Sequence, residues 1–142
     1  MDNLEKQICR FFNAQHEINM AYEDFAKQNG MTYNCNQVMH LIYNNPGCTL
    51  KTLNEWTKLP KLTINSLVTN MYSDSLVELR ENPEDRRCKA IYYSEKGQEA
   101  ADDIFSSLRD LVRQAMQGLD DSERTVLIDV MEKFAELMKK GM

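Results

Sequence analysis

The sequence predicts a mainly α-helical fold that contains a single two-stranded β-hairpin. Apolar residues recur at helical spacing over most of the 142 residues. This pattern is broken once, between Leu76 and Tyr93, where apolar and polar residues alternate as they do in a half-buried strand. A chain of this length is enough for one domain with a proper core. The predicted order is four helices, a hairpin, a long helix and a final helix.

The first two helices are indicated by their apolar spacing and by the residues that follow them. The first continues until Gly30 ends it, and its apolar residues are Leu4, Ile8, Phe11, Phe12, Ile18, Tyr22 and Phe25. The second is expected over residues 34–43, with Val38, Leu41 and Ile42 facing inward. The Asn-Asn-Pro-Gly sequence that comes next predicts a turn.

Two shorter helices follow this turn. The third is expected to begin near Thr49 and to bury Leu50 and Leu53, with Trp56 as a further candidate. Pro60 suits the first turn of the fourth helix, where its missing N–H is not needed. The fourth helix has an apolar stripe at i, i+3, i+4 and i+7, formed by Ile64, Leu67, Val68 and Met71. Its opposite face carries short polar side chains, without the long Glu and Lys pairs that are common on solvated helices.

The alternating segment predicts a hairpin that would act as a wing. Its strands are expected at residues 76–81 and 89–93, around a turn at Asn82–Asp85. The third and fourth helices, joined by a short turn around Lys58 and Leu59, have the layout of a helix-turn-helix. A hairpin directly behind such a motif is expected to lie beside its second helix.

Two longer helices are predicted to complete the chain. Ser94 can cap a helix over residues 95–117, which would be roughly 34 Å long at 1.5 Å per residue. Gly118 ends this helix. Asp120 and Glu123 then form a capping box for the last helix.

The helix-turn-helix and the wing indicate a protein that binds duplex DNA. The second helix of this motif enters the major groove, where short polar and basic side chains read base edges. Arg86 and Arg87 lie at the expected tip of the wing, where a guanidinium can reach phosphates or the adjacent minor groove. Asp85 can hold a guanidinium in place by a charge-assisted hydrogen bond. The alternative is that these three residues form a solvated surface cluster at a turn.

The charge distribution places any contact with a polyanion in the middle of the chain. The net charge is −5, which argues against general adhesion to nucleic acids. Residues 58–89, however, contain six basic side chains against five acidic ones, so this window carries +1 and the remainder −6. The main alternative to DNA binding is a winged helix whose polar face binds another protein.

Several short sequences carry a likeness to a known family. The most specific are Pro83–Arg87 and Ser94–Gly97, and the shorter ones are Met31-Thr32, Gln37-Val38, Thr49-Leu50, Leu53, Leu67-Val68 and Leu76-Val77. Through them, residues 31–97 resemble the winged-helix core of the MarR family of bacterial transcriptional regulators. The flanking helices match in length and pattern. The expected fold class is therefore mainly α, a winged helix-turn-helix with long flanking dimerisation helices and one two-stranded β-hairpin wing.

The resemblance implies an obligate homodimer that binds a pseudo-palindromic operator, usually as a repressor released by a small molecule or an oxidant. It implies one domain, residues 1–142, with dimerisation helices at 1–30 and 98–142 and a winged helix-turn-helix lobe at 34–97. The DNA contacts that it implies are Lys61, Thr63, Asn65, Ser66 and Asn70 in the recognition helix and Arg86 and Arg87 in the wing.

Five positions depart from the family pattern. Ser66 and Asn70 stand where basic residues are frequent, so the recognition helix is poor in arginine. Asn54 replaces a small alanine where two helices cross tightly, and Lys58 replaces a glycine in the turn. Ser75 stands where a glycine normally ends the recognition helix. These departures concern the operator sequence and the strength of binding more than the fold.

Two kinds of input are compatible with the residues. The position of Cys9 in the first helix, with Tyr22 and Tyr33 further along, is similar to the hydroperoxide-sensing branch of the family. An ungapped alignment places Ile8 at the sensing position, about 100° around the helix from Cys9. Cys9 is therefore either a redox switch or a packing residue.

A small-molecule effector is the other possible input. The family usually binds ligands in a cleft between the dimer-forming helices and the DNA-binding lobe. The candidates to line it are His16, Tyr22, His40 and Tyr43. The alternative for each is a packing role on its own helix.

The sequence gives no support for an enzyme, a metal site or a cofactor. The four cysteines never occur as Cys-x-x-Cys, and there are only two histidines. No Gly-rich phosphate loop and no nucleophile with a recognisable base are present. The N-terminal residues are charged and amphipathic, unlike a signal peptide, and no apolar run is long enough to span a membrane. We therefore expect a cytoplasmic protein.

Overall fold

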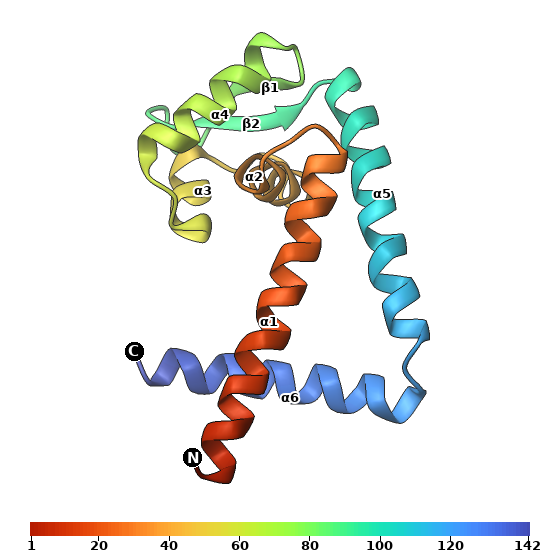
Figure 1. The fold of residues 1–142 in the computed structure, drawn as a ribbon. Helices are drawn as coiled ribbons and strands as arrows, with labels where there is room; N and C mark the ends of the chain where they lie inside the picture. Colours follow the sequence, from red (N-terminus) through yellow and green to blue (C-terminus); the bar gives the residue numbers. More distant parts are fainter. The chain divides into compact units, whose positions relative to one another are not determined.

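A computed structural model of the chain describes all 142 residues as six helices and one two-stranded hairpin, in the predicted order (Figure 1). The elements are α1 (Asn3–Gln28), α2 (Tyr33–Asn44), α3 (Leu50–Thr57), α4 (Lys61–Ser73), β1 (Val77–Glu81), β2 (Lys89–Tyr93), α5 (Glu95–Gln117) and α6 (Asp121–Lys140). The chain divides into two compact units, Met1–Phe105 and Ser106–Met142.

Helix α2 is the centre of the first unit. It contacts α1, α3, α4 and β2, and Figure 1 shows these elements arranged around it. Thr32 caps the start of the helix, because its Oγ1 accepts a hydrogen bond from the N–H of Cys35 at 3.1 Å. Val38 and Ile42 on α2 are fully buried, together with Leu53, Ile64 and Ile91 from the elements around it. Helix α2 therefore lies at the centre of the core, and the surrounding elements pack against it.

Helix α1 is attached to this core at one end only. Its buried residues are Phe25 and Ala26, near its C-terminus. The helix then stops as predicted, because Gly30 adopts φ +71°, a left-handed conformation that favours glycine. The large apolar residues nearer its N-terminus stay exposed, among them Leu4, Ile8, Phe11, Phe12 and Ile18.

Two details of the predicted helix-turn-helix were wrong. Leu53 is fully buried as expected, but Leu50 and Trp56 are 37% and 48% exposed. The reason is that α3 has eight residues and packs mainly on α2 and α4, so that Leu53 is its one buried residue. Pro60 is the residue before α4 and not a member of its first turn, and no side chain caps this end.

The hairpin is anchored to the rest of the lobe by a short third segment. Its antiparallel register pairs Val77 with Tyr93 and Leu79 with Ile91. The residues before α3 extend this sheet: the N–H of Gly47 donates to the carbonyl of Ile91, and the N–H of Ile91 donates to that of Cys48, both at 2.8 Å. The predicted second strand is confirmed to the residue, while the first begins one residue later than predicted.

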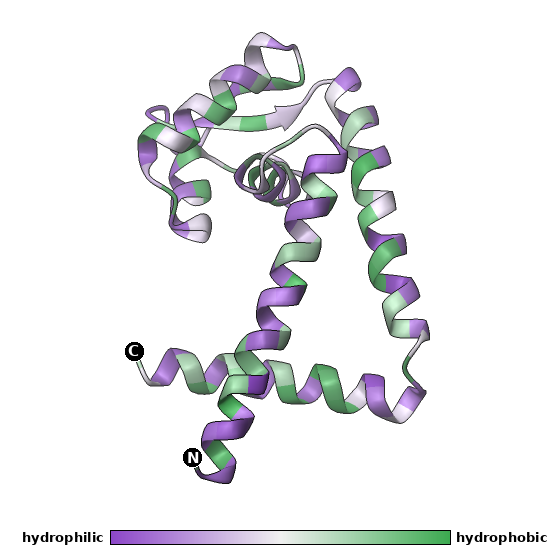
Figure 2. Ribbon diagram, in the orientation of Figure 1, coloured by the Kyte–Doolittle hydropathy of each residue, from purple (hydrophilic) through white to green (hydrophobic).

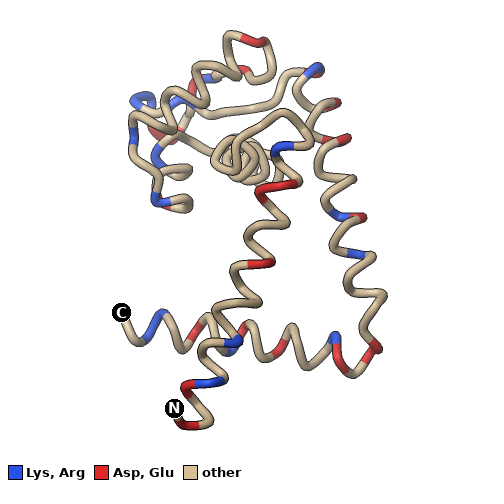
Figure 3. The backbone as a smooth tube through the Cα atoms, in the orientation of Figure 1, with Lys and Arg blue, Asp and Glu red and all other residues tan.

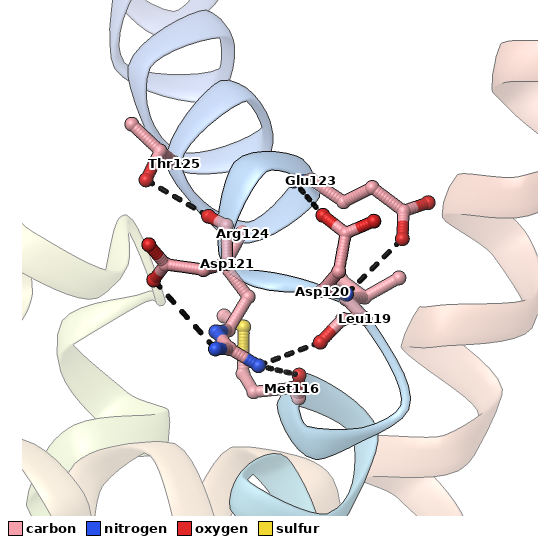
Figure 4. A network of polar contacts seen from close by, with 7 residues as sticks. All are labelled: Met116, Leu119, Asp120, Asp121, Glu123, Arg124 and Thr125. Atoms are coloured by element: carbon pink, nitrogen blue, oxygen red, sulfur yellow. Dashed lines mark hydrogen bonds and ion pairs between the residues drawn. The ribbon is translucent and has the colours of Figure 1, made fainter.

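A polar network builds the corner between α5 and α6 (Figure 4). The guanidinium of Arg124 donates to the carbonyl oxygens of Met116 at 3.1 Å and Leu119 at 2.6 Å, in the last turn of α5 and just beyond it. Asp120 and Glu123 form the predicted capping box, with bonds of 2.8 Å and 3.1 Å. The end of α5 and the start of α6 are therefore both capped.

Helix α6 carries a long apolar surface that the chain itself does not cover. None of its residues is buried, and Figure 2 shows apolar positions recurring along its length. The exposed large apolar residues are Val126, Leu127, Ile128, Val130, Met131, Phe134, Leu137 and Met138. No helix of the structure has the length and apolar character that a membrane span requires.

Candidate nucleic-acid interface

Helix α4 separates its buried and exposed residues cleanly. Ile64, Val68 and Met71 form the buried stripe that was predicted, and Leu67 is half-buried beside it. The opposite face is exposed and consists mainly of short polar side chains, namely Asn65, Ser66, Thr69, Asn70 and Ser73, with Lys61 and Leu62 at the N-terminal end. Of the residues expected to contact DNA on this helix, only Thr63 is half-buried, at the edge of the exposed face.

The turn that sets the angle between α3 and α4 is held by side chains. Lys58 adopts φ +60° in the position where the family has glycine. The amide nitrogen of Asn54 donates to the carbonyl oxygen of Leu59 at 2.6 Å. The hydroxyl of Thr57 donates to the carbonyl of Leu53 at 2.7 Å and accepts from the N–H of Leu59 at 3.1 Å. These bonds fix the turn although a non-glycine residue occupies it.

The C-terminal end of α4 is fastened to the start of α5. Ser75 adopts φ +62°, again where the family has glycine. The hydroxyl of Ser94 donates to the carbonyl of Ser75 at 2.6 Å and accepts from the N–H of Gly97 at 3.0 Å, which confirms Ser94 as the cap of α5. The ammonium group of Lys96 donates to the carbonyl of Asp74 at 3.2 Å. The recognition helix is therefore positioned at both of its ends.

The tip of the wing is organised differently from the expectation. The carboxylate of Asp85 accepts a hydrogen bond from the backbone N–H of Arg87 at 3.0 Å. It therefore stabilises the turn and does not hold a guanidinium in place. The guanidinium that has a partner is that of Arg86, 3.4 Å from the carboxylate of Glu81. Since the side chain of Arg86 is 88% exposed, this ion pair is weak, and the guanidinium can leave Glu81 to bind a phosphate.

One well-ordered arginine of the hairpin was missed in the sequence. The guanidinium of Arg80 donates to the carboxylate of Glu78 at 2.9 Å and lies 4.3 Å from the ring centre of Tyr92. Glu78 and Tyr92 are partners in the hairpin register, so all three side chains share one face. The alternating pattern could have placed them together, but the length of the turn had to be known before the strands could be paired.

Basic residues recur along α3, the turn that follows it and the hairpin (Figure 3). Lys51 and Lys61 line a hollow of about 290 Å³ between α3 and α4, together with Leu50, Asn54, Ile64 and Asn65. Lys51 was also missed, because a single lysine on a short helix has no distinguishing pattern. Two ammonium groups beside the polar face of α4 can meet the phosphates that border a major groove.

The expected ligand-pocket residues are only partly brought together. His40 stacks on Phe105 with ring centres 4.7 Å apart, and Tyr43 lies against the same ring at 5.0 Å. Burial lowers the pKa of His40, so its neutral form is favoured. On α1, His16 is exposed and Tyr22 half-buried, and neither joins this stack.

The cysteines occupy contrasting environments. Cys9 is exposed on α1. Burial raises the pKa of Cys35, and it raises that of the Cys48 thiol to about 11. Burial, followed by the nearby Cys35 and Cys48 thiols, also raises the pKa of Tyr93, whose hydroxyl donates to the carbonyl of Met39 at 2.6 Å. Cys35 and Cys48 are therefore protonated packing residues at neutral pH. No group of three or more His, Cys, Asp or Glu side chains is placed to hold a metal ion.

Comparison with known proteins gives a consistent result. Residues 29–87 match the sequence model of the MarR family. YwhA, an uncharacterized HTH-type transcriptional regulator of Bacillus subtilis strain 168, is 27% identical over 100 residues, which cover 70% of this chain and 71% of that protein. The structure of NMB1585, a MarR family regulator from Neisseria meningitidis, has a TM-score of 0.75 at 23% identity and covers 99% of this chain and 96% of its own. A MarR transcriptional regulator from Methanosarcina mazei Go1 also has a TM-score of 0.75, at 17% identity, with coverage of 96% and 99%.

Proposed function

Because residues 29–87 match the sequence model of the MarR family and the whole chain has the fold of its regulators, we propose that this protein is a homodimeric transcriptional regulator that binds an operator in duplex DNA. The observation that carries the proposal is the exposed face of α4. It is a row of short polar side chains, flanked by the lysines of the α3–α4 hollow and followed directly by a wing with two exposed arginines. A regulator of this kind acts on DNA in the cytoplasm.

The residues of α4 and the wing make different kinds of contact with the DNA. Helix α4 enters the major groove, where the amide groups of Asn65 and Asn70 can each form two hydrogen bonds with an adenine. Ser66 adds a short hydroxyl, and Thr63 contacts the groove wall from the edge of the face. Lys61, Arg86 and Arg87 meet phosphates, which supply attraction and register but carry no sequence information. Since no arginine is present on the exposed face of α4, the contacted positions should favour A·T pairs.

A second copy of the chain covers the apolar surfaces of α1, α5 and α6. Soluble monomers rarely leave contiguous apolar patches of this extent in water. The eight exposed apolar residues of α6, together with those of α1, would exceed that extent in a monomer. Two-fold symmetry then places two copies of α4 about one helical turn of DNA apart, so that the operator is pseudo-palindromic. Sedimentation at micromolar concentration that shows only a 16.6 kDa species would contradict the dimer.

Release from DNA is assigned to a small molecule that binds near His40, Tyr43 and Phe105. These aromatic residues belong to α2 and α5, and α2 also contacts α3, α4 and β2. A ligand that moves α2 would therefore shift the whole reading face, and in a repressor this shift would lower operator affinity. The alternative input is oxidation of Cys9, which is exposed and so open to a peroxide.

The proposal is tested by selecting duplexes from a random pool with the purified protein. We expect sites with dyad symmetry, half-sites about one helical turn apart and A·T-rich contacted positions. Asn65→Ala and Asn70→Ala should each relax the preference at one position of the half-site, at a cost of about 1–3 kcal/mol in discrimination. Selected sequences without symmetry, or a preference that both variants retain, would mean that α4 does not read the operator. Failure to retain any duplex would favour a protein-binding role for the same face.

A further inference from the structure

Leu62 is an unusual residue on the exposed face of α4. It is the second residue of the helix, and its side chain is 82% exposed. Among the large apolar residues, only the terminal Met1 and Met142 are as exposed or more so. The core positions of the same helix-turn-helix are only 0–3% exposed, as at Leu53, Ile64 and Val68, and the partly exposed Leu50 and Trp56 reach 37% and 48%. A leucine in this place gains nothing from the fold, which points to a contact outside the chain.

Helical geometry places Leu62 along the middle of the exposed face of α4, opposite the buried stripe. With 3.6 residues per turn, Ser66, Thr69 and Ser73 lie within about 20–40° of Leu62 around the helix axis. The buried stripe that contains Ile64, Val68 and Met71 lies on the opposite side. Leu62 is therefore the only apolar side chain along the centre of a face that otherwise carries short hydroxyl groups.

The major groove of DNA offers one apolar group for such a side chain. Thymine carries a 5-methyl group there, whereas the other base edges present hydrogen-bond donors and acceptors. Residues near the N-terminus of a recognition helix are the ones that contact base edges. Asn65 is one turn further along the same helix, so an adenine bound by its amide and a thymine beside Leu62 can belong to the same or adjacent base pairs.

We propose that Leu62 is a specificity-determining residue that packs against the 5-methyl group of a thymine in each operator half-site. The inference rests on the proposed function and adds an apolar contact to the hydrogen bonds of Asn65 and Asn70. Leu62 then excludes cytosine, which lacks this methyl group and presents an amino group that a leucine cannot pair with. The preference for A·T pairs thus has a second source that is independent of the asparagines.

The test uses duplexes selected by the wild-type protein, in which each thymine is replaced in turn by deoxyuridine, which lacks only the methyl group. We expect one position per half-site where this replacement weakens wild-type binding by about fourfold, and by about fifteenfold when both half-sites are changed. Leu62→Ala should bind the thymine duplex more weakly and should show no further loss on the deoxyuridine duplex. Leu62→Met should keep most of the methyl-dependent difference.

Asn65→Ala is the matched control on the same helix face. It should weaken binding but retain the deoxyuridine penalty, because it leaves the leucine in place. Specific binding by the wild type without any position where the penalty depends on Leu62 would overturn this inference and leave the proposed function intact. Absence of sequence-specific duplex binding by the wild type would overturn both. Leu62→Ala should unfold at the wild-type temperature, since its side chain is exposed.

Discussion

Replacement of Gly97 by alanine should loosen the joint between the recognition helix, the wing and α5. A Cβ atom built on Gly97 would overlap the carbonyl oxygen of Leu76 and lie 2.7 Å from its carbonyl carbon, where ordinary contact begins at 3.4 Å. Both partners are backbone atoms, so no flexible side chain can move out of the way. The first turn of α5 must therefore shift away from Leu76, which leads into β1.

That shift breaks the hydrogen bonds that fasten this joint. The N–H of Ser94 donates to the carbonyl of Leu76 at 2.9 Å, and the bonds from Ser94 to Ser75 and from Lys96 to Asp74 lie next to it. Loss of three bonds at about 1 kcal/mol each, less about 0.5–1 kcal/mol because alanine favours a helix over glycine, leaves a destabilisation of about 2 kcal/mol. The affinity for DNA should fall as well, since the same bonds position α4 and the wing.

Urea unfolding at a fixed protein concentration measures this change, because the stability of a dimer depends on concentration. Gly141→Ala is the matched control. A Cβ on Gly141 would meet its nearest atom at 3.6 Å, an ordinary contact, so this variant should stay within about 0.5 kcal/mol of the wild type. If Gly97→Ala were as stable as Gly141→Ala, the close approach of α5 to Leu76 would not exist.

Three further predictions concern single side chains. Ser75→Gly should raise the free energy of unfolding by about 1 kcal/mol, because it relieves a left-handed conformation at φ +62°; an unchanged urea midpoint would contradict this. Burial lowers the pKa of His40 below its ordinary value of 6.5, so the unfolded chain binds the proton more tightly. Stability should therefore fall as the pH drops below about 6.5 towards the lowered pKa, and His40→Phe should flatten this dependence in thermal unfolding across pH 5–8. Arg87→Ala should weaken binding similarly for all duplex sequences and reduce the salt slope by about one unit for each phosphate that the variant no longer binds; an unchanged slope would return this arginine to a solvated cluster.

The elements were predictable because local signals agreed with the final packing. The capping box at Asp120 and the cap at Ser94 each satisfy backbone groups of their own helix, so they can be recognised without knowledge of the fold. Lys58 and Ser75 adopt positive φ angles at positions where the family pattern has glycine, and this backbone conformation was not predicted from the sequence. The exposure of Leu50 and Trp56 was not predictable, because it depends on how few neighbours surround α3.

The candidate interface was predicted in outline and less well in its side chains. The exposed face of α4 follows from helical periodicity, so Asn65, Ser66 and Asn70 could be selected from the sequence. Leu62 was passed over because an apolar residue on a helix is ordinarily assigned to the core. The role of Asp85 was misjudged, since a carboxylate next to an arginine can bond either the guanidinium or the backbone, and only the turn geometry decides between them. The effector and redox assignments stay predictions.

We expect the α4 face and the wing to bind duplex DNA through phosphate contacts from both halves of a dimer. The most direct measurement is the affinity of the purified protein for a dyad-symmetric duplex, chosen by selection, over a range of salt concentrations. We expect a linear fall of log K with log salt, with a slope of about −0.9 for each phosphate contacted and therefore of roughly −5 if Lys61, Arg86 and Arg87 of each protomer each bind one phosphate. An affinity that does not respond to salt, or equal affinity for the selected duplex and a scrambled one, would contradict it.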